Sequence, residues 1–458
     1  MKFCSRPFKF IHLDPNGGCR LCAWTDISIG DLTKKSVEEV WNSEEAEKVR
    51  EAIRNGNYEY CRKTSCPFLE NDSLPEVDEK DAKNYEAEPI PTQYSVACDF
   101  TCNHKCPSCR NEIFKPNDEY KNNLEIILNK ILPYLNSDST EKILTDGNGD
   151  CFASPYIMKM LENLHPKNEE CHIIFETNGA FLDEEHWKRI KHLEKYWLQV
   201  TVTPNSFIKS TFEYLNGGVH SYEQVMKNLI FIRDLRSTGI LNWVKISIVL
   251  QEKNFWEFPE FAKKCLDDFK ADEVVAKPLY KWFMLSEDDY WFKDVLNPLH
   301  PYHKEYLKML ENPILKDERI FYWGANNLHE PRRHPAYFYE EQNKIIRYIL
   351  DDGTQNFKEN IQQKGITDVY LYGDNTLTVV FYKKLHEMNI NIKGILVRDK
   401  KNKKCCGVEV QCLKDYTPSQ NDTIIVMNYN YIRQIVRDLH FKGFTGRIIN
   451  AKELTDIE

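Results

Sequence analysis

The segment YSVACDFTCNHKCPSCR, residues 94–110, combines a predicted β-strand with three closely spaced cysteines. The apolar start reads as a strand, and Cys102, Cys106 and Cys109 follow it in a C-x3-C-x2-C spacing. Three thiolates bind three irons of a four-iron cluster and leave the fourth iron open. A structural zinc site needs four protein ligands, so zinc with Cys98 or His104 as the fourth ligand is the alternative.

Downstream of this segment, short apolar or β-branched runs alternate with longer amphipathic stretches. The short runs are YSVA, KILT, HIIFET, LQVTVT, VKISIVL and EVVAKP, and helix-length stretches such as NNLEIILNKILPYL separate them. Repeated strand-helix units imply parallel pairing through right-handed crossovers, with ligand sites at the carboxyl ends of the strands. We therefore predict an α/β fold, a partial (β/α)6 TIM-type barrel, over residues 93–285.

The remaining sequence is too long for one further domain, since the chain has 458 residues. The last predicted domain contains a glycine after its first strand, Gly373, but Asn375 and Thr378 stand where a dinucleotide-binding fingerprint has further glycines. This departure favours a structural role for the domain over dinucleotide binding. The predicted segments are a small metal-binding module (1–70), an acidic linker (71–92), the barrel (93–285), an irregular extension (286–345) and a Rossmann-like α/β domain (346–458).

Composition excludes several classes of function. The net charge is -9, and the basic run at 400–404 is short, so nucleic acid is not an expected partner. No apolar run approaches the roughly 20 residues that cross a bilayer, and the first residues do not resemble a secretory signal. We expect a cytoplasmic protein with no membrane partner. In that compartment fifteen cysteines favour metal ligation over disulfides.

The cysteine loop after the first barrel strand, with Asn103 and Pro107 around it, resembles the signature of the radical S-adenosylmethionine (radical SAM) superfamily. The resemblance extends through most of the barrel. It implies a [4Fe-4S] cluster whose open iron is chelated by S-adenosylmethionine, and a reductase such as flavodoxin or ferredoxin as the electron source. It also implies cleavage of the cofactor to a 5'-deoxyadenosyl radical, which abstracts a hydrogen atom from the substrate.

The same resemblance implies cofactor contacts after the later strands. At one position the chain departs from the family, because Asn216 stands where many relatives have an arginine for the cofactor carboxylate, and a neutral hydrogen bond is weaker than a charge-assisted one. The glycine-rich segment has a plain turn as its alternative. The implied contacts are Gly147, Asn148, Gly149 and Asp150 after strand two, Thr177 and Asn178 after strand three, Thr201 and Thr203 on strand four, and Gln251 and Asn254 after strand five.

Residues 1–70 resemble the SPASM or twitch auxiliary-cluster module, which in its better known arrangement follows the barrel. The likeness rests on the cysteine pattern, an Ile-Gly-Asp strand, a Trp-bearing helix and a closing C-x4-C-P. It implies a second [4Fe-4S] cluster, and a zinc knuckle is the alternative. The implied ligands are Cys4, Cys22, Cys61 and Cys66, with Cys19 as a possible substitute.

An auxiliary cluster that accepts an electron favours net oxidation. We therefore expect an oxidoreductase of the dehydrogenase or epimerase type that acts on a sugar, a cyclitol or a nucleotide-linked sugar. A peptide-modifying maturase that cross-links or epimerises its substrate is the second hypothesis, and a non-catalytic metal-binding scaffold is the third. For an epimerisation, Cys98 and Cys151 are candidate hydrogen donors, with inert buried thiols as the alternative.

Overall fold

The computed structural model covers residues 1–458 and divides the chain into two compact units, Met1–Arg332 and Arg333–Glu458. Each unit is described here by itself. The described residues are all except 63–65, 71, 111, 146, 218–221, 280–289, 291–292, 298–299, 323–335, 351–352, 398–403, 428–434, 437–438, 441 and 456–458.

A sheet of ten strands, in the order β10-β9-β8-β7-β6-β5-β4-β1-β2-β3, forms the frame of the first unit. The predicted strands are all present as β4 to β9, and each pairs in parallel with the next. The partial TIM-type barrel is therefore confirmed. The bounds are β1 (Phe10–Leu13), β2 (Gly18–Arg20), β3 (Gly30–Asp31), β4 (Gln93–Val96), β5 (Lys142–Thr145), β6 (His172–Thr177), β7 (Trp197–Val202), β8 (Trp243–Leu250), β9 (Glu273–Pro278) and β10 (Ile320–Tyr322).

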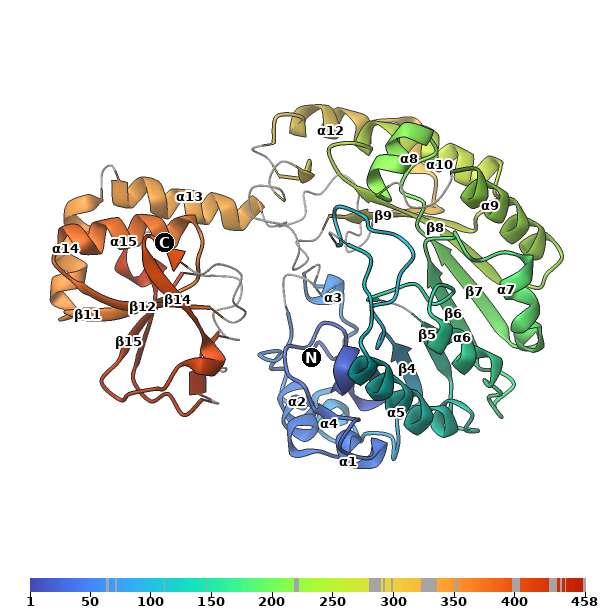
Figure 1. The fold of residues 1–458 in the computed structure, drawn as a ribbon, viewed down its shortest axis with the longest axis horizontal. Helices are drawn as coiled ribbons and strands as arrows, with labels where there is room; N and C mark the ends of the chain where they lie inside the picture. The colour runs from blue at the N-terminus through green and yellow to red at the C-terminus, as the bar shows by residue number, and fades with distance from the viewer. Residues whose placement is uncertain are drawn as a thin grey trace. The chain divides into compact units, whose positions relative to one another are not determined.

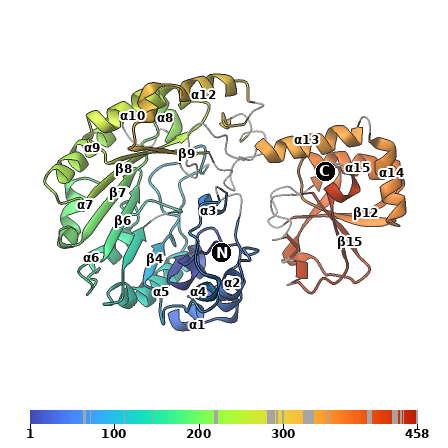
Figure 2. The ribbon, with the colours of Figure 1, turned by 180° about the vertical axis from the view of Figure 1, so that it is seen from behind.

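Helices cover one face of this sheet (Figures 1 and 2). Short polar residues start several of them, because the side chains of Asn117, Ser154 and Asp183 accept hydrogen bonds from backbone N–H groups in the first turn. The helices are α5 (Asp118–Leu135), α6 (Pro155–Glu162), α7 (Glu184–Arg189), α8 (Lys209–Leu215), α9 (Tyr222–Ser237) and α10 (Phe258–Asp267).

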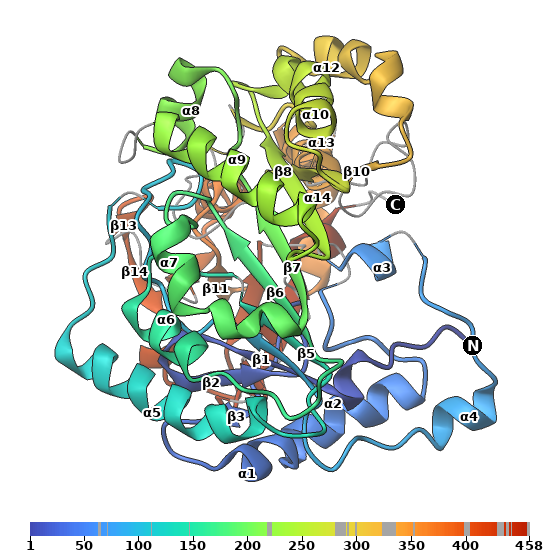
Figure 3. The ribbon, with the colours of Figure 1, turned by 90° about the vertical axis from the view of Figure 1, so that its right-hand side faces the viewer.

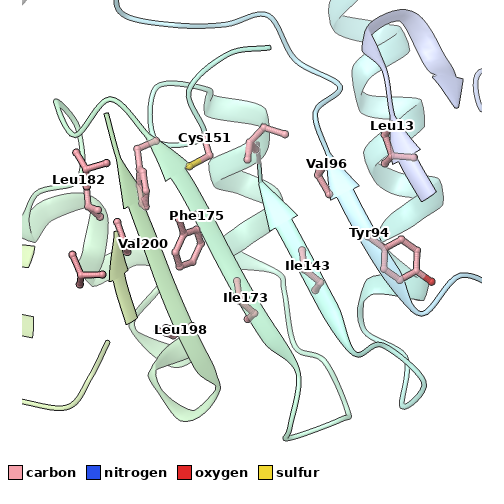
Figure 4. Close-up of a cluster of buried hydrophobic side chains, with 14 of the residues drawn as sticks. Leu13, Tyr94, Val96, Ile143, Cys151, Ile173, Phe175, Leu182, Leu198 and Val200 are labelled. Atoms are coloured by element: carbon pink, nitrogen blue, oxygen red, sulfur yellow. The ribbon is translucent and has the colours of Figure 1, made fainter. Parts of the chain in front are cut away.

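The strands alternate between two environments. Side chains on the helix-covered face, among them Ile143, Ile173, Phe175, Leu198 and Val200, are fully buried and form a continuous core across neighbouring strands (Figure 4). The opposite face, which we call the inner face, carries mostly polar and half-buried side chains. Its residues on the central strands are Gln93, Ser95, Lys142, Leu144, His172, Ile174, Glu176, Trp197, Gln199, Thr201, Lys245, Ser247, Val249, Glu273, Val275 and Lys277.

The amino-terminal segment joins this sheet directly. β1 pairs in parallel with β4, in the register Phe10 to Gln93 and Leu13 to Val96, and β2 and β3 extend the same edge (Figure 3). The short helices α1 (Val37–Trp41), α2 (Glu44–Arg54), α3 (Pro67–Glu70) and α4 (Glu79–Lys83) complete the segment.

In the range 71–92, expected to be a linker, the described residues 72–92 are bound along the amino-terminal segment. The Met1 ammonium donates to the Val77 carbonyl at 2.6 Å, and the Val77 N–H donates back to the Met1 carbonyl at 2.9 Å. The Trp41 indole N–H donates to the Glu88 carbonyl at 2.8 Å. The acidic composition does not prevent this, because the backbone makes the contacts while the charged side chains face solvent.

The range 286–345, expected to be irregular, contains regular elements among its described residues. Helix α12 (His303–Leu310) lies there, and β10 adds a strand to the sheet by pairing in parallel with β9. Three strand residues are too few to give a readable period.

The second unit has a sheet in the order β13-β14-β12-β11-β15-β16. All neighbours from β14 to β16 are parallel, and the order reverses direction at β11. The first helix begins at Ala336, ahead of the boundary expected at 346. The elements are α13 (Ala336–Leu350), α14 (Thr354–Gln363), β11 (Asp368–Tyr372), α15 (Thr376–Glu387), β12 (Asn391–Val397), β13 (Lys404–Cys405), β14 (Val408–Cys412), β15 (Thr423–Val426) and β16 (Arg447–Asn450). Within the described ranges, no helix combines the length and the apolar composition needed to cross a membrane.

Candidate active site and metal centres

The loop after β4 holds Cys102, Cys106 and Cys109, and two glycines let neighbouring loops approach it closely. A Cβ on Gly149, in the loop after β5, would lie 2.7 Å from the Asp99 carbonyl oxygen and closer still to that of Thr101. A Cβ on Gly217, after α8, would lie 2.5 Å from the Lys105 carbonyl oxygen. The close contact explains why glycine occupies both positions.

The thiols of this loop influence one another. Burial is the main cause that raises the pKa of Cys102 to about 11 and that of Cys106 to about 12; Asp150 contributes to the rise at Cys102, and the neighbouring Cys109 contributes at both. The positive charge of Arg110 acts to lower the pKa of both thiols. Such thiols are neutral without metal, and iron would bind them as thiolates with release of protons. Three adjacent thiols in one loop fit the donor set of a four-iron cluster with one open iron.

Buried carboxylates brace the loops around these cysteines. Asp150 accepts hydrogen bonds from the Thr177 hydroxyl at 2.8 Å and from the Asn178 N–H at 2.7 Å, and so joins the end of β5 to the end of β6. Burial raises the pKa of Asp150, while these hydrogen bonds act against the rise. Asp99 accepts from the Ser154 hydroxyl at 2.5 Å and from the Tyr120 hydroxyl at 3.0 Å.

Amide side chains complete the rim of the loop. The Asn178 side-chain amide donates to the side-chain oxygen of Asn103 at 2.7 Å, and its nitrogen lies 3.8 Å from the Cys102 sulfur. Asn148 donates to the Ala97 carbonyl at 2.8 Å. The Arg110 guanidinium donates to the Asn148 carbonyl at 2.6 Å and lies 3.9 Å from the Cys109 sulfur.

Asn216, the residue that departs from the family pattern, contacts the cysteine loop. It is buried, and its amide nitrogen donates to the backbone carbonyls of Phe212 at 3.0 Å and Pro204 at 3.3 Å. Its carbonyl oxygen accepts from the Cys106 thiol at 3.7 Å. The side chain therefore fixes the end of α8 against the loop.

The predicted cofactor contacts on and after β7 and β8 differ in how many hydrogen bonds their side chains already make within the protein. The Thr203 hydroxyl bonds the Ser247 hydroxyl at 2.8 Å on the inner face, and Thr201 lies on the same face. Asn254 is fully buried and donates both amide hydrogens to backbone, to Asn205 at 2.9 Å and Val249 at 3.0 Å. It also accepts from the Gln251 N–H at 2.9 Å. Asn254 therefore shapes the turn after β8, which positions Gln251.

The two candidate hydrogen donors lie in the core. Cys98 is 1% and Cys151 is 6% exposed, and both belong to the hydrophobic core of the first unit. Figure 4 shows Cys151 within the cluster that contains Phe175. Burial raises the pKa of both thiols far above the ordinary value. This environment favours the inert alternative for both.

The amino-terminal cysteines form a second group. Burial raises the pKa of Cys4 to about 11, with further contributions from Cys22 and Cys66. Burial also raises the pKa of Cys61, and Cys22, Cys4 and Cys66 add to it. These four thiols are thus mutual neighbours. Cys19 is not among them, because its titratable neighbours are Asp14, Cys98 and Asp31.

The two groups of thiols lie at opposite ends of one sheet. Cys102, Cys106 and Cys109 follow the carboxyl end of β4, whereas Cys4 precedes the amino end of β1, which is parallel to β4. β2 runs antiparallel to β1 and brings Cys22 back to that same amino end. A strand of four residues spans roughly 13 Å. The inner face of the sheet therefore extends from the amino-terminal group of cysteines to the loop of Cys102, Cys106 and Cys109.

Among the described residues, no set of three or more His, Cys, Asp or Glu side chains is arranged around a position for a single metal ion. In a [4Fe-4S] cluster each thiolate binds an iron of its own, so the thiols of a cluster site are not gathered around one point.

Several residues of these sites escape sequence reasoning. Arg110 directly follows the last signature cysteine and carries a polar signal that spacing alone does not interpret. Asp99 looks like an ordinary loop residue until Ser154 and Tyr120 come together on it. Such pairings between distant residues have no local signal.

The comparisons with known proteins agree with this arrangement. Residues 4–67 match the iron-sulfur cluster-binding domain SPASM, and residues 100–265 match the radical SAM superfamily. No curated protein sequence matches the chain.

Among solved structures, the chain is similar to SuiB of Streptococcus suis bound to S-adenosylmethionine, with a TM-score of 0.34 and 12% identity over 55% of this chain and 56% of that one. The chain thus spans little more than half the length of SuiB. It is also similar to HydG, a maturase of the [FeFe]-hydrogenase, with a TM-score of 0.31 and 11% identity over 88% of this chain and 78% of that one. The domain matches imply [4Fe-4S] clusters and S-adenosylmethionine as the cofactors. The chain contains an amino-terminal SPASM domain followed by a radical SAM domain.

Proposed function

We propose that the chain is a radical SAM oxidoreductase that oxidises a sugar, a cyclitol or a nucleotide-linked sugar. The observation that carries this proposal is the polar inner face between the two groups of cysteines. It carries the half-buried hydroxyl of Thr203, which bonds Ser247, and the buried hydroxyls of Thr201 and Ser247. It also presents the ion pairs Lys277 with Glu176 at 3.9 Å and Lys245 with Glu273 at 2.6 Å. Such a surface suits a substrate rich in hydroxyl groups, because each buried polar group needs a partner.

The cofactors divide between the two ends of this face. We propose Cys102, Cys106 and Cys109 as ligands of the cluster that binds S-adenosylmethionine. We propose Cys4, Cys22, Cys61 and Cys66 as ligands of the auxiliary cluster, with Cys22 preferred over Cys19 because of its neighbours. When bound, the first cluster and S-adenosylmethionine supply a 5'-deoxyadenosyl radical that takes a hydrogen atom from the substrate.

The chain's own residues hold these groups in place. Asp150, through Thr177 and Asn178, fixes the loop that carries Gly147, Asn148 and Gly149. Asn178 and Asn216 lie against the Cys102 and Cys106 sulfurs. Asn254 positions Gln251 at the end of β8. These contacts support a cofactor site at the carboxyl ends of the strands, in the position common to parallel sheets.

The outcome we favour is oxidation. An epimerisation needs a hydrogen donor beside the substrate, and Cys98 and Cys151 are both buried in the core. An auxiliary cluster at the far end of the inner face offers a path for the second electron instead. A flavodoxin or ferredoxin would supply the first electron.

The second candidate, modification of a peptide, has one observation in its favour. β10 lies at the end of the strand order, and its Phe321 is 49% exposed. An edge strand can pair with an extended peptide through main-chain hydrogen bonds. A peptide substrate would then slow hydrogen exchange at the β10 amides, whereas a sugar would slow exchange around the inner face.

For the second unit we propose a Rossmann-like domain in a structural role. Its parallel strands run in the order β14-β12-β11-β15-β16, which corresponds to the 3-2-1-4-5 part of the doubly wound order 3-2-1-4-5-6. The loop after β11 has side chains where such sites need bare backbone, because Asn375 caps α15 by accepting from the Thr378 N–H at 3.1 Å.

The test of the proposed function is anaerobic reconstitution followed by turnover. We expect about eight irons per chain, four at each site, and slow release of 5'-deoxyadenosine with dithionite and S-adenosylmethionine. Replacing Cys102, Cys106 and Cys109 by Ala should abolish the release and leave about four irons. The matched control replaces Cys405 and Cys406 of the second unit by Ala and should change neither. Stoichiometric zinc without labile sulfide would disprove the proposal.

The substrate class needs its own readout. A panel of sugars, cyclitols and nucleotide-linked sugars, deuterated at carbon, should include one that transfers deuterium into 5'-deoxyadenosine. Transfer from a peptide and from no sugar would instead favour the second candidate.

A further inference from the structure

Four cationic side chains, those of Arg6, Lys9, Lys142 and Lys245, gather at the end of the inner face that adjoins the auxiliary cysteines. Strand register places Phe10, Gln93, Lys142 and His172 in one row across β1, β4, β5 and β6. The Arg6 guanidinium covers this row at its β1 end, 3.9 Å from the centre of the Phe10 ring. All these residues except Phe10 are half-buried, so the row remains accessible.

Arg6 has hydrogen-bond capacity to spare. A guanidinium carries five N–H donors and is always charged. The Arg6 Nε is buried and has no hydrogen-bond partner among the described residues. The contact of its guanidinium with Phe10 holds the charge in place without using those donors.

The pKa of Lys142 reflects the positive charge that surrounds the row. Burial lowers the pKa of Lys142, and Arg6, Lys9 and Lys245 lower it further. Three carboxylates offset part of this charge. Glu273 pairs with Lys245 at 2.6 Å, Glu141 acts to raise the pKa of Lys142, and Glu170 acts to raise that of His172. The four cations Arg6, Lys9, Lys142 and Lys245 outnumber these carboxylates, so the row has an excess of positive charge.

The row lies next to the auxiliary site. Arg6 is two residues from Cys4, and its charge acts to lower the pKa of both Cys4 and Cys66. The opposite end of the inner face leads to the loop of Cys102. A molecule anchored at Arg6 and Lys142 would extend along the inner face from the auxiliary site toward the cofactor site.

We propose that Arg6 and Lys142, with Lys9 and Lys245 beside them, bind an anionic group of the substrate. This inference rests on the proposed function and narrows its substrate to molecules with a carboxylate or a phosphate ester, such as a sugar acid or a nucleotide-linked sugar. Arg6 offers a planar pair of donors for either oxyanion, and Lys142 adds a point charge.

The test is binding of small anions to the full chain with its clusters reconstituted, measured by calorimetry at low and high salt. Inorganic phosphate and acetate are the two probes, and the tighter one identifies the chemistry of the anionic group. We expect each of Arg6→Gln and Lys142→Gln to weaken the tighter probe about tenfold, because each removes a charge-assisted hydrogen bond. Lys209→Gln, an exposed lysine on α8, is the matched control and should bind as the wild type does.

The outcomes separate the possible explanations. If neither anion binds, or if both variants bind as tightly as the control, the inference is wrong. If Arg6 only balances the charge of the auxiliary thiolates, Arg6→Gln will lose iron at that site while Lys142→Gln binds phosphate and acetate normally, which also overturns it. The proposed function is tested independently, by the metal content of the wild-type chain, its release of 5'-deoxyadenosine and deuterium transfer from the substrate panel, none of which depends on the binding of phosphate or acetate.

Discussion

Gly149 is the position where a single methyl group should disturb the cysteine loop most. In Gly149→Ala the new Cβ would lie 2.7 Å from the Asp99 carbonyl oxygen and closer to that of Thr101. Both atoms belong to backbone, so neither can rotate away, and the two loops must separate. Overpacking in a tight site costs about 1 to 3 kcal/mol, and we expect the upper half of that range, a Tm lower by about 4 to 6 °C.

The matched control is Gly18→Ala. Gly18 has a φ of -59° and a ψ of 144°, which any residue adopts. A Cβ there would lie 3.6 Å from the Asp14 Cβ, an ordinary contact. We expect a change in the free energy of unfolding within about 0.5 kcal/mol.

Tryptophan fluorescence is the assay that reports on the correct unit. All nine tryptophans of the chain precede residue 333, so a fluorescence-detected transition follows the first unit alone. The displaced loop should also lower the iron content at Cys102, Cys106 and Cys109. Equal Tm values for the two variants, with full iron in both, would refute the close contact between the loops.

Three further predictions concern the auxiliary site, the second unit and the shared sheet. Replacing Cys61 and Cys66 by Ala should preserve release of 5'-deoxyadenosine but prevent formation of oxidised product; product at the wild-type rate in a mass-spectrometric assay would exclude a redox role. Burial acts to raise the pKa of Asp422, but hydrogen bonds from Tyr416 and Lys393 outweigh it and hold the pKa below the ordinary 3.8. This stabilisation is present above pH 3.8 and is lost as the pH falls through the lower folded value. In urea unfolding followed by circular dichroism, Asp422→Asn should therefore cost about 1 to 3 kcal/mol at pH 7 and less near pH 3; an equal cost at both pH values would contradict the assignment. Removal of everything before β4 should yield an insoluble or unfolded barrel, because it exposes the edge of β4; a soluble barrel with native Tm would contradict this.

The barrel could be predicted from the sequence because its signals are local. Runs such as HIIFET and VKISIVL alternate with helical stretches, and β6 and β8 formed where those runs lie. The cysteine loop was equally readable, because its three ligands fall within eight residues, 102–109.

The rest depended on contacts between distant residues. FIHL became a strand of the barrel sheet through pairing with residues about 80 positions later, for which no short window carries a signal. The same is true of Arg6 beside Lys142 and of Asp99 beside Ser154. Cys22 and Cys19 are three residues apart, and only the direction of β2 separates their environments.

The parallel pairing of β1 with β4 makes the auxiliary cysteines part of the connection between two neighbouring strands of the barrel sheet. Parallel neighbours need a crossover connection between the end of one strand and the start of the next. Between β1 and β4 that crossover is residues 14–92, which carry Cys22, Cys61 and Cys66, while Cys4 precedes β1. The auxiliary module thus takes the place that a helix takes elsewhere in the barrel. Metal bound there would stabilise the crossover, and with it the position of β4 and the loop that follows it. The two sites are therefore parts of one folding unit, and loss of the auxiliary metal should lower the unfolding temperature of the sheet that carries the Cys102 loop, even though release of 5'-deoxyadenosine continues below that temperature.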